Sequence, residues 1–175
     1  MKFFVLPITK NPAFGRVGQE ELQDWYRGCA RAVQIQRGLS SAGHDAEIVV
    51  LSDVHIKGYR HEAEYYQDAL KKLGAKNVRT IQQGQETVGQ IEIILEIAKK
   101  EDAKLVVVST FGHYLRLAWL LRGTDAQHET VFGLPLFREL ITDGILTVLF
   151  PLIDLTVGRE WFQNKVVHRR ESGKH

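Results

Sequence analysis

The sequence predicts a single three-layer α/β domain, in which a doubly wound, mainly parallel sheet of about five strands lies between two layers of helices. Short apolar runs rich in β-branched residues alternate along the chain with longer segments whose apolar residues recur at helical spacing. Strands connected through helices pair in parallel and are covered on both faces, which explains why each reads as a continuous apolar run. No linker or internal repeat divides residues 1–175, and we expect a flexible tail over about 164–175.

The first half of the chain shows this alternation twice. The run KFFVLPI at 2–8 is short and continuously apolar, which indicates a strand buried on both faces. Apolar residues recur at helical spacing through 19–42, and Gly43 follows as a helix stop. AEIVVLS at 46–52 is predicted as a second strand, and HEAEYYQDALKKLG at 61–74 as a second helix that ends on a glycine.

The second half continues the pattern. NVRTIQ at 77–82 is a weaker strand, and TVGQIEIILEIAKKE at 87–101 carries its large aliphatic residues on one helical face. AKLVVVST at 103–110 is the clearest strand of the chain, and a fourth helix follows it directly within the segment STFGHYLRLAWLLRG, residues 109–123. ETVFGL at 129–134 is predicted as the fifth strand.

The last apolar segment runs from Pro135 to about Trp161 and again has a helical pattern, which Pro151 is expected to kink or break. We expect its apolar residues to pack against the sheet. The alternative is that 134–157 forms a surface for a membrane or a partner protein.

Composition argues against several classes of function. The formal net charge of +2, from 23 basic and 21 acidic residues, gives no polybasic surface, so we expect no nucleic-acid partner. We find no apolar stretch long enough to span a bilayer, and the first residues do not form a signal peptide. The single cysteine, Cys29, is expected to be a small buried hydrophobe, which fits a reducing, cytoplasmic setting.

In open parallel sheets, ligands bind beyond the carboxyl ends of the strands. The segments that follow the first four predicted strands are TKNPAFG, SDVHIKGYRHE, QQGQET and STFGH. They contain neither a dinucleotide-binding glycine pattern nor a P-loop, which excludes those two classes of site. Asp53, His55 and His61 are an alternative metal set, although histidines in loops are commonly just solvated.

His113 and Arg116 are the most promising pair in these segments. His113 follows a strand at the start of a helix, where the helix dipole favours neutral imidazole. Arg116 lies one turn later on the same face and brings a fixed fork of donors, which suits an anionic ligand. The alternative is an ordinary surface helix whose arginine pairs with a neighbouring carboxylate.

Two other positions have a structural explanation as well as a functional one. Glu62 begins a predicted helix, where the dipole alone favours an acidic residue. Thr87 is a natural N-cap for the next helix. Neither position decides between the two explanations by itself.

Taken in chain order, the segments IVVLS, HEAEYYQDALKKLGA and QETVGQ through LLRG resemble the YdcF/SanA-like family of bacterial domains of unknown function. That family has a strand ending in Ser-Gly-Gly, Glu-Ala opening the next helix, an Asn-Thr-x-Glu-Asn helix start, and a strand running into Thr-Ser-x-x-His-x-x-Arg. The positions that match are Ser52, Glu62-Ala63, Thr87, Ser109-Thr110, His113 and Arg116, and an arginine of the family's first long helix corresponds to Arg31. The resemblance covers roughly residues 27–123.

The chain departs from the family pattern at two places. Asp53 and Val54 replace the two glycines that follow the strand. In the Asn-Thr-x-Glu-Asn segment only Thr87 is kept; Gly89 replaces the glutamate, which removes a possible acid/base group, and Gln90 keeps an amide with a longer reach. The resemblance therefore implies a retained pocket with an altered ligand preference or a lost activity.

The resemblance also implies a Rossmann-like fold, but no settled reaction comes with it. One member of the family is reported to bind S-adenosylmethionine, and others are linked to envelope integrity and lipid-carrier metabolism. Our leading hypothesis is a site for a small phosphorylated or nucleotide-like anion, with hydrolysis or group transfer at phosphorus as the chemistry. The alternatives are a non-catalytic binder of S-adenosylmethionine or another adenosyl compound, and a peripheral membrane or partner-docking factor.

The residues expected to form this site come from all four segments and from the first helix. We expect His113 and Glu62 to act on the reacting group. Ligand contacts are expected from Arg116, Thr87, Ser109, Thr110, Ser52, Gln90, Arg31 and Asn11.

Overall fold

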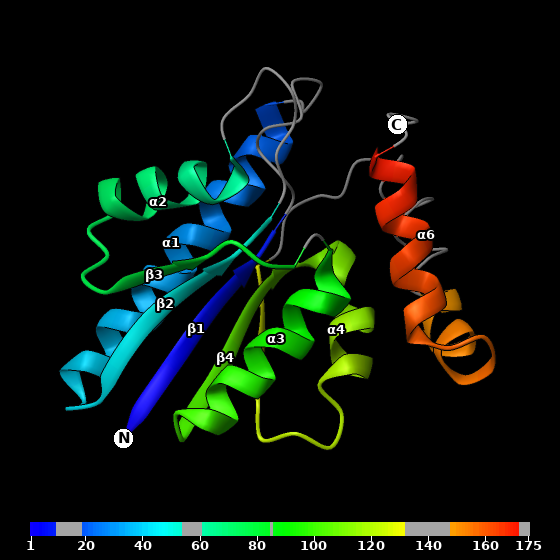
Figure 1. Cartoon of the computed structure of the whole chain (residues 1–175). Helices are drawn as coiled ribbons and strands as arrows, with labels where there is room; N and C mark the ends of the chain where they lie inside the picture. The colour runs from blue at the N-terminus through cyan, green and yellow to red at the C-terminus, as the bar shows by residue number, and fades with distance from the viewer. Residues whose placement is uncertain (10–18, 54–60, 85, 132–147, 172–175) are drawn as a thin grey trace.

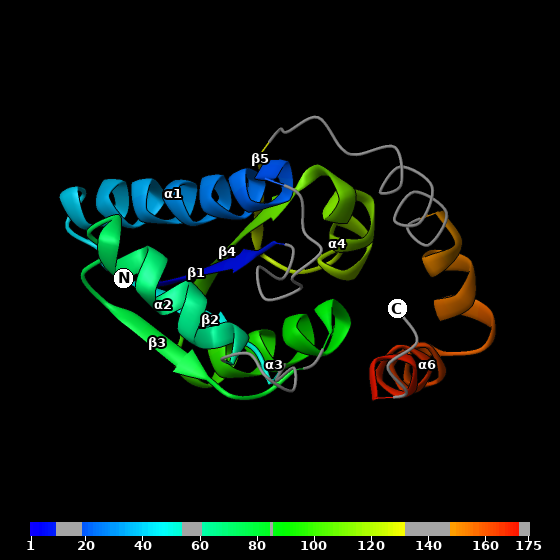
Figure 2. The same ribbon diagram turned by 90° about the horizontal axis from the view of Figure 1, so that it is seen from above.

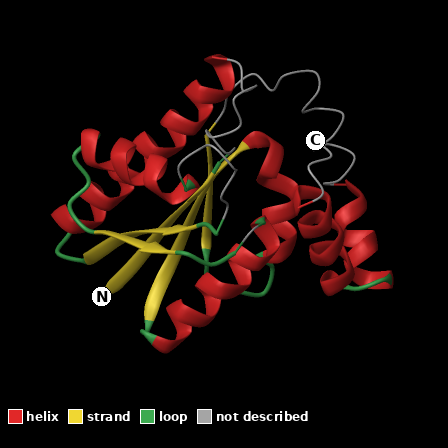
Figure 3. Ribbon diagram, turned by 45° about the horizontal axis from the view of Figure 1, so that its top comes forward, coloured by secondary structure: helices red, strands yellow, loops and turns green. Residues whose placement is uncertain are grey.

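The computed structural model describes residues 1–9, 19–53, 61–84, 86–131 and 148–171 (Figure 1). It confirms the predicted α/β class: a five-stranded, all-parallel sheet is flanked by helices on both faces (Figure 3). The strands are β1 (Lys2–Ile8), β2 (Asp45–Leu51), β3 (Val78–Ile81), β4 (Ala103–Thr110) and β5 (Gln127–Val131).

The strand order is β3-β2-β1-β4-β5, with β1 at the centre. The chain therefore builds one half of the sheet outward from β1 to β3 and then crosses back to place β4 on the other side of β1. β1 and β4 are paired along their length, from Lys2 opposite Ala103 to Ile8 opposite Ser109. The carboxyl ends of these two strands mark the point where the order reverses, and ligands bind there in sheets of this topology.

The helices form the outer layers. They are α1 (Gln19–Ser41), α2 (Glu62–Lys72), α3 (Thr87–Lys100), α4 (Tyr114–Leu120) and α6 (Arg159–Glu171), with a 3-10 turn at Phe111–His113 and a further helix over 148–156. Helices α1 and α2 pack on one face of the sheet, and α3 and α4 on the other. Helix α6 packs against α3, outside the inner helix layer (Figure 2).

The alternating side chains of β1 show how one strand serves both layers. Phe4, Leu6 and Ile8 point into the cluster that α3 and α4 complete, whereas Val5 points into the cluster beneath α1 and α2. Cys29 lies buried in this second cluster, as predicted, and burial raises the pKa of its thiol to about 12. No helix in the described ranges is both long and apolar enough to cross a bilayer.

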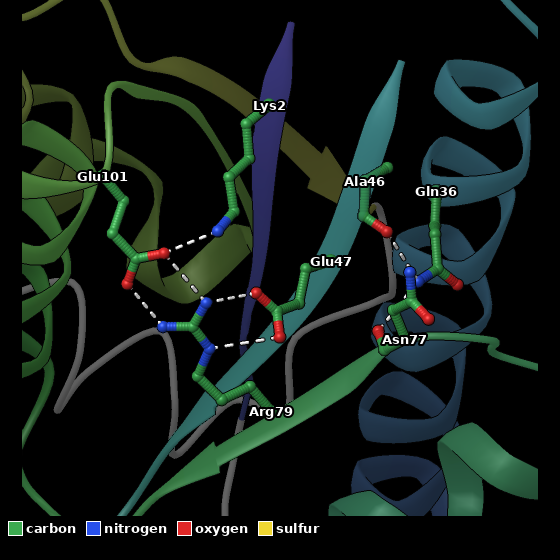
Figure 4. A network of polar contacts seen from close by, with 7 residues as sticks. All are labelled: Lys2, Gln36, Ala46, Glu47, Asn77, Arg79 and Glu101. Atoms are coloured by element: carbon green, nitrogen blue, oxygen red, sulfur yellow. Dashed lines mark hydrogen bonds and ion pairs between the residues drawn. The ribbon is translucent and has the colours of Figure 1, made fainter. Parts of the chain in front are cut away.

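Charged side chains lie together at the amino end of the sheet, on the sheet face that α3 covers (Figure 4). Glu101 accepts from Lys2 Nζ at 2.6 Å and from Arg79 Nη1 at 2.6 Å. Arg79 also donates to both carboxylate oxygens of Glu47, from Nε at 3.1 Å and from Nη2. These four side chains, called the amino-edge network below, join β1, β2 and β3 to the end of α3.

A buried glutamine holds the same end of the sheet from the α1 side (Figure 4). Gln36 Nε2 donates to the carbonyl oxygens of Ala46 at 3.2 Å and Asn77 at 2.8 Å. Its side-chain oxygen accepts from the backbone N–H of Lys76 at 3.2 Å. One amide thereby satisfies backbone groups at the starts of both β2 and β3.

The structure corrects two sequence predictions about the last third of the chain. Strand β5 begins at Gln127, earlier than predicted, because Gln127 and His128 pair in register with the buried β4. The helix over 148–156 continues through Pro151 without a break, and Gly158, which follows it two residues later, has the left-handed φ of +92° typical of the residue after a helix end. Residues 132–147 lie outside the described part of the chain. Helix α6 reaches Glu171 and so includes much of the segment expected to be a flexible tail.

Candidate functional site

Arg116 is the central cation at the carboxyl end of the sheet. β4 ends at Thr110, a single 3-10 turn follows, and α4 then places Arg116 on its inner face, where the side chain is only 8% exposed. Its Nη2 donates to His113 Nδ1 at 2.6 Å and lies 3.5 Å from Thr87 Oγ1 on α3. Three of the residues predicted for the site, one each from the 3-10 turn, α4 and α3, are thus brought together.

This contact assigns the tautomer of His113. A guanidinium has only donors, so Nδ1 must accept and the single ring proton must be on Nε2. With this tautomer the ring is a neutral imidazole, and its Nε2–H is a hydrogen-bond donor. It does not start the α-helix itself but ends the preceding 3-10 turn and serves as the N-cap position of α4.

Ser52 and Glu62 form a second buried pair. Ser52 directly follows β2, Glu62 is the first residue of α2, and the hydroxyl donates to Glu62 Oε2 at 2.5 Å. Ser52 is 1% and Glu62 7% exposed. Burying a carboxylate costs free energy unless it is hydrogen-bonded, so this pair is more than a helix-start preference.

Thr9 and Tyr66 belong to the same end of the sheet, although neither was predicted as a site residue. Thr9 follows β1, and its hydroxyl hydrogen-bonds to that of Tyr66, one helical turn after Glu62. Burial, together with the charge of Glu62, holds the pKa of Tyr66 well above its usual 10, so its phenol keeps its proton. The spacing of Tyr66 four residues after Glu62 was the available signal, because such residues share a helix face.

Glu86, and not Thr87 as predicted, is the N-cap of α3. Its carboxylate accepts from the backbone N–H of Val88 at 2.7 Å and of Gly89 at 2.5 Å. A Cβ at residue 89 would lie only 3.1 Å from Glu86 Oε1, so the glycine suits this arrangement. The chain thus keeps a buried carboxylate beside the helix start even though the glutamate of the family pattern is absent at residue 89.

Other predicted residues make structural contacts. Gln90 Nε2 donates to the carbonyl oxygens of Leu51 at 2.8 Å and Gly84 at 3.2 Å, which ties the end of β2 to the start of α3. Ser109 is fully buried and its Oγ lies 2.7 Å from His128 Nε2 on β5. Thr110 is the buried last residue of β4.

His128 was missed by the sequence analysis because nothing in the sequence places β5 beside β4. Its ring stacks on Tyr114 of α4 at a centroid distance of 5.2 Å. Burial lowers the pKa of His128 below its usual 6.5, so its imidazole tends to stay neutral. The contact to Ser109 connects β5 to the carboxyl end of β4.

The structure does not bring Arg31 to Arg116. Arg31 lies on α1, on the opposite face of the sheet from α4, and forms an ion pair with Glu129 of β5 at 2.7 Å. Asn11 and His55 lie outside the described residues. Among the residues that are described, no group of three histidines, cysteines or acidic residues is placed to hold a metal ion.

An acidic cleft of about 410 Å³ lies beside the start of α3, between that helix and α6. Glu86, Glu92 and Glu96 line it from the α3 side, and Gln163 and Asn164 line it from α6. Gln163 donates to Glu92 at 2.9 Å. The second carboxylate oxygen of Glu92 accepts from Arg159 at 3.0 Å, so the acidic wall is partly neutralised by α6 itself.

Neither a scan against models of known protein families nor a search of curated proteins finds a match for this chain. A function can therefore be proposed only from the geometry at the carboxyl ends of the strands, called the carboxyl edge below.

Proposed function

We propose that the carboxyl edge of the sheet binds a small phosphorylated or nucleotide-like ligand, with Arg116 contacting its anionic group. The observation that carries this proposal is the burial of Arg116 between His113 and Thr87, at the point where the strand order reverses. A planar, permanently charged guanidinium suits phosphate or carboxylate recognition, and burial strengthens that interaction. The YdcF/SanA-like resemblance, which names this same pair, also supports the proposal.

The same residues suit chemistry at phosphorus. His113 presents an Nε2–H, because its Nδ1 accepts from Arg116, and so it can donate to an oxygen of the ligand or protonate a leaving group. Glu62, held by Ser52, is a carboxylate that can orient a hydroxyl or a water. Reactions at phosphorus need positioning and charge neutralisation more than an activated nucleophile, and these residues supply both.

S-adenosylmethionine, the ligand that the resemblance implies, is the second candidate. Glu62 and Glu86 are buried carboxylates, which suit a cationic sulfonium or ammonium group. Phe111 follows β4 directly and is about half-exposed, so it places an aromatic ring at this end of the sheet, and adenine stacks on such rings. We propose no reaction step through this compound.

The test is a thermal-shift panel of nucleotides, sugar phosphates, inorganic phosphate and S-adenosylmethionine, followed by calorimetric titration of whichever compound raises the Tm. We expect Arg116→Ala to lower the affinity for a phosphorylated ligand about tenfold or more, because a buried charge-assisted contact is lost. Stabilisation by adenosyl compounds alone, without turnover, would favour the second candidate.

Arg31→Ala is the matched control, since it removes an arginine that the resemblance also names but that lies on the opposite face of the sheet. Its affinity should equal that of the wild type. An unchanged affinity for Arg116→Ala, or an equal loss in Arg31→Ala, would contradict the proposal, as would the absence of any stabilising compound in the panel.

A further inference from the structure

The helix over 148–156 turns a line of aliphatic side chains toward solvent. Val148, Leu152 and Leu155 are 68%, 60% and 68% exposed. Their spacing of four and three residues puts them on one face of the helix, so they form a continuous line and not scattered contacts. We call these three residues the apolar strip.

The exposure of the strip does not come from a loosely attached helix. On its other face Phe150 is fully buried and packs edge-on against Phe162 of α6, with ring centroids 5.0 Å apart. Asp154 accepts from Trp119 Nε1 of α4 at 2.9 Å and from Arg159 Nε at 3.1 Å. The helix is therefore anchored to both α4 and α6 with the strip directed away from the core.

Aromatic and basic groups follow the strip along the chain. Val157 is exposed in the turn, and Trp161 is exposed in the first part of α6. Lys165 Nζ lies 5.8 Å from the centre of the Trp161 ring, and both Lys165 and His168 are exposed on α6. Over 148–175 the sequence has five basic residues against three acidic ones: Arg159, Lys165, Arg169, Arg170 and Lys174 against Asp154, Glu160 and Glu171.

We propose that the apolar strip, together with Trp161 and Lys165 of the adjoining α6, docks onto the surface of an anionic lipid bilayer. Aliphatic side chains enter the boundary of the acyl chains, a tryptophan lies at the level of the headgroups, and a lysine reaches lipid phosphates over its apolar stem. The excess of basic residues over the last part of the chain complements a negative membrane surface.

The placement of the strip favours a membrane over a protein groove. The 148–156 helix and α6 form the outermost helix pair on their side of the molecule, beyond α3 and α4 (Figure 2). An outward-facing aliphatic line on such a pair can contact a flat surface without a partner reaching into a cleft. The membrane proposal uses none of the residues of the ligand site, so either the membrane proposal or the ligand proposal can be wrong without affecting the other.

The test is vesicle flotation of the full chain with phosphatidylcholine vesicles that contain or lack phosphatidylglycerol. We expect the wild type to float with the phosphatidylglycerol vesicles at low salt, and less at high salt, because the electrostatic part is screened. Leu152→Ser combined with Leu155→Ser should lower the bound-to-free ratio about tenfold or more, since binding scales with the apolar area buried. Lys165→Gln should weaken flotation with the anionic vesicles only.

Tyr26→Ser is the matched control, because Tyr26 is a large exposed side chain on α1, in the opposite helix layer. It should float like the wild type, and circular dichroism and Tm should show that all variants are folded. A wild type that stays at the bottom with anionic vesicles overturns the proposal, as does equal flotation of the leucine double variant. A dimer that this double variant converts to monomer also overturns it, because a second copy then covers the strip.

Discussion

The two ends of the same sheet hold their charged groups in opposite ways. In the amino-edge network, cations meet carboxylates, and the side chains of Lys2, Glu47, Arg79 and Glu101 are 21% to 31% exposed. At the carboxyl end, Glu62 and Arg116 are almost completely buried, and their hydrogen bonds include a serine hydroxyl and an imidazole.

This difference in burial indicates that the charged groups at the amino end stabilise the fold, whereas those at the carboxyl end suit the binding of a ligand. Partly exposed ion pairs keep much of their hydration, so they cost little and join neighbouring strands. Buried ionisable groups cost free energy on folding, and a chain that retains several at one place commonly uses them for binding or catalysis. The contrast with the amino edge therefore supports the carboxyl edge as the functional end.

The largest expected effect on stability tests how closely the carboxyl edge is packed. A Cβ at Gly28 of α1 would overlap Thr9 Cγ2, and Thr9 is held by its bond to Tyr66. Gly28→Ala should therefore lower the free energy of unfolding by about 1–3 kcal/mol. In the same helix, toward the amino edge of the sheet, a Cβ at Gly38 would meet no atom within 4 Å. Gly38→Ala should therefore raise the free energy of unfolding by up to about 1 kcal/mol. Urea denaturation measures the free energy of unfolding of both variants, and equal changes would contradict the expected difference in packing between the two ends of α1.

A smaller effect is expected from the amino-edge network. Arg79→Met should lower the free energy of unfolding by about 1 kcal/mol at neutral pH, a value kept low by the partial exposure of the pairs. Arg31→Met, which breaks a more exposed pair with Glu129, is the control and should change it less.

The same variant should change the acid sensitivity of the protein. Hydrogen bonds from Arg79 and Lys2 hold the pKa of Glu101 at about 2, below its usual 4.5. A carboxylate whose pKa is depressed on folding stabilises the protein above pH 4.5, and this contribution is lost as the pH falls toward 2. Denaturation midpoints measured over this range should fall less steeply in Arg79→Met than in the wild type. Parallel curves would show that the network does not control acid stability.

The smallest effect is expected at the carboxyl edge in mild acid. Burial lowers the pKa of His128 below 6.5, so the unfolded chain takes up a proton before the folded one does. The contribution of neutral His128 to the free energy of unfolding is therefore fully present above pH 6.5, and it is lost as the pH falls below 6.5. The midpoint of the wild type should drop between neutral and mildly acidic pH, with a shallower drop in His128→Asn. The same slope in both proteins would remove His128 as the cause.

The elements predicted best from the sequence are those whose own residues are continuously apolar, because such a run indicates burial directly. The bounds of β1 and β4 agree with prediction, because strands covered on both faces are continuous apolar runs. The start of β5 could not be found in this way, since Gln127 and His128 are polar and only their pairing with β4 makes them strand residues. Pro151 was expected to kink or break the last helical segment, whereas the helix over 148–156 runs through this residue without a break.

Only part of the contacts within the candidate site could be predicted from the sequence. The sequence indicates which segments follow the strands, and parallel strands bring those segments to one edge. It does not give the strand order, so the Thr9–Tyr66 and Ser109–His128 contacts, between residues 57 and 19 positions apart, could not be found. Arg31 was expected to contact the ligand because of its place in the family pattern; in the structure it lies on α1 and forms an ion pair with Glu129.

The hydrogen bonds of Gln36 have a consequence for the order of folding. β3 is a four-residue edge strand with no fully buried side chain, so its own residues specify its pairing weakly. Part of its register is fixed by a glutamine 41 residues before Asn77, and that side chain is in position only once α1 has packed on β2. We therefore expect β3 to join the sheet after β1, α1 and β2 have assembled, because the contact that aligns it does not exist before then.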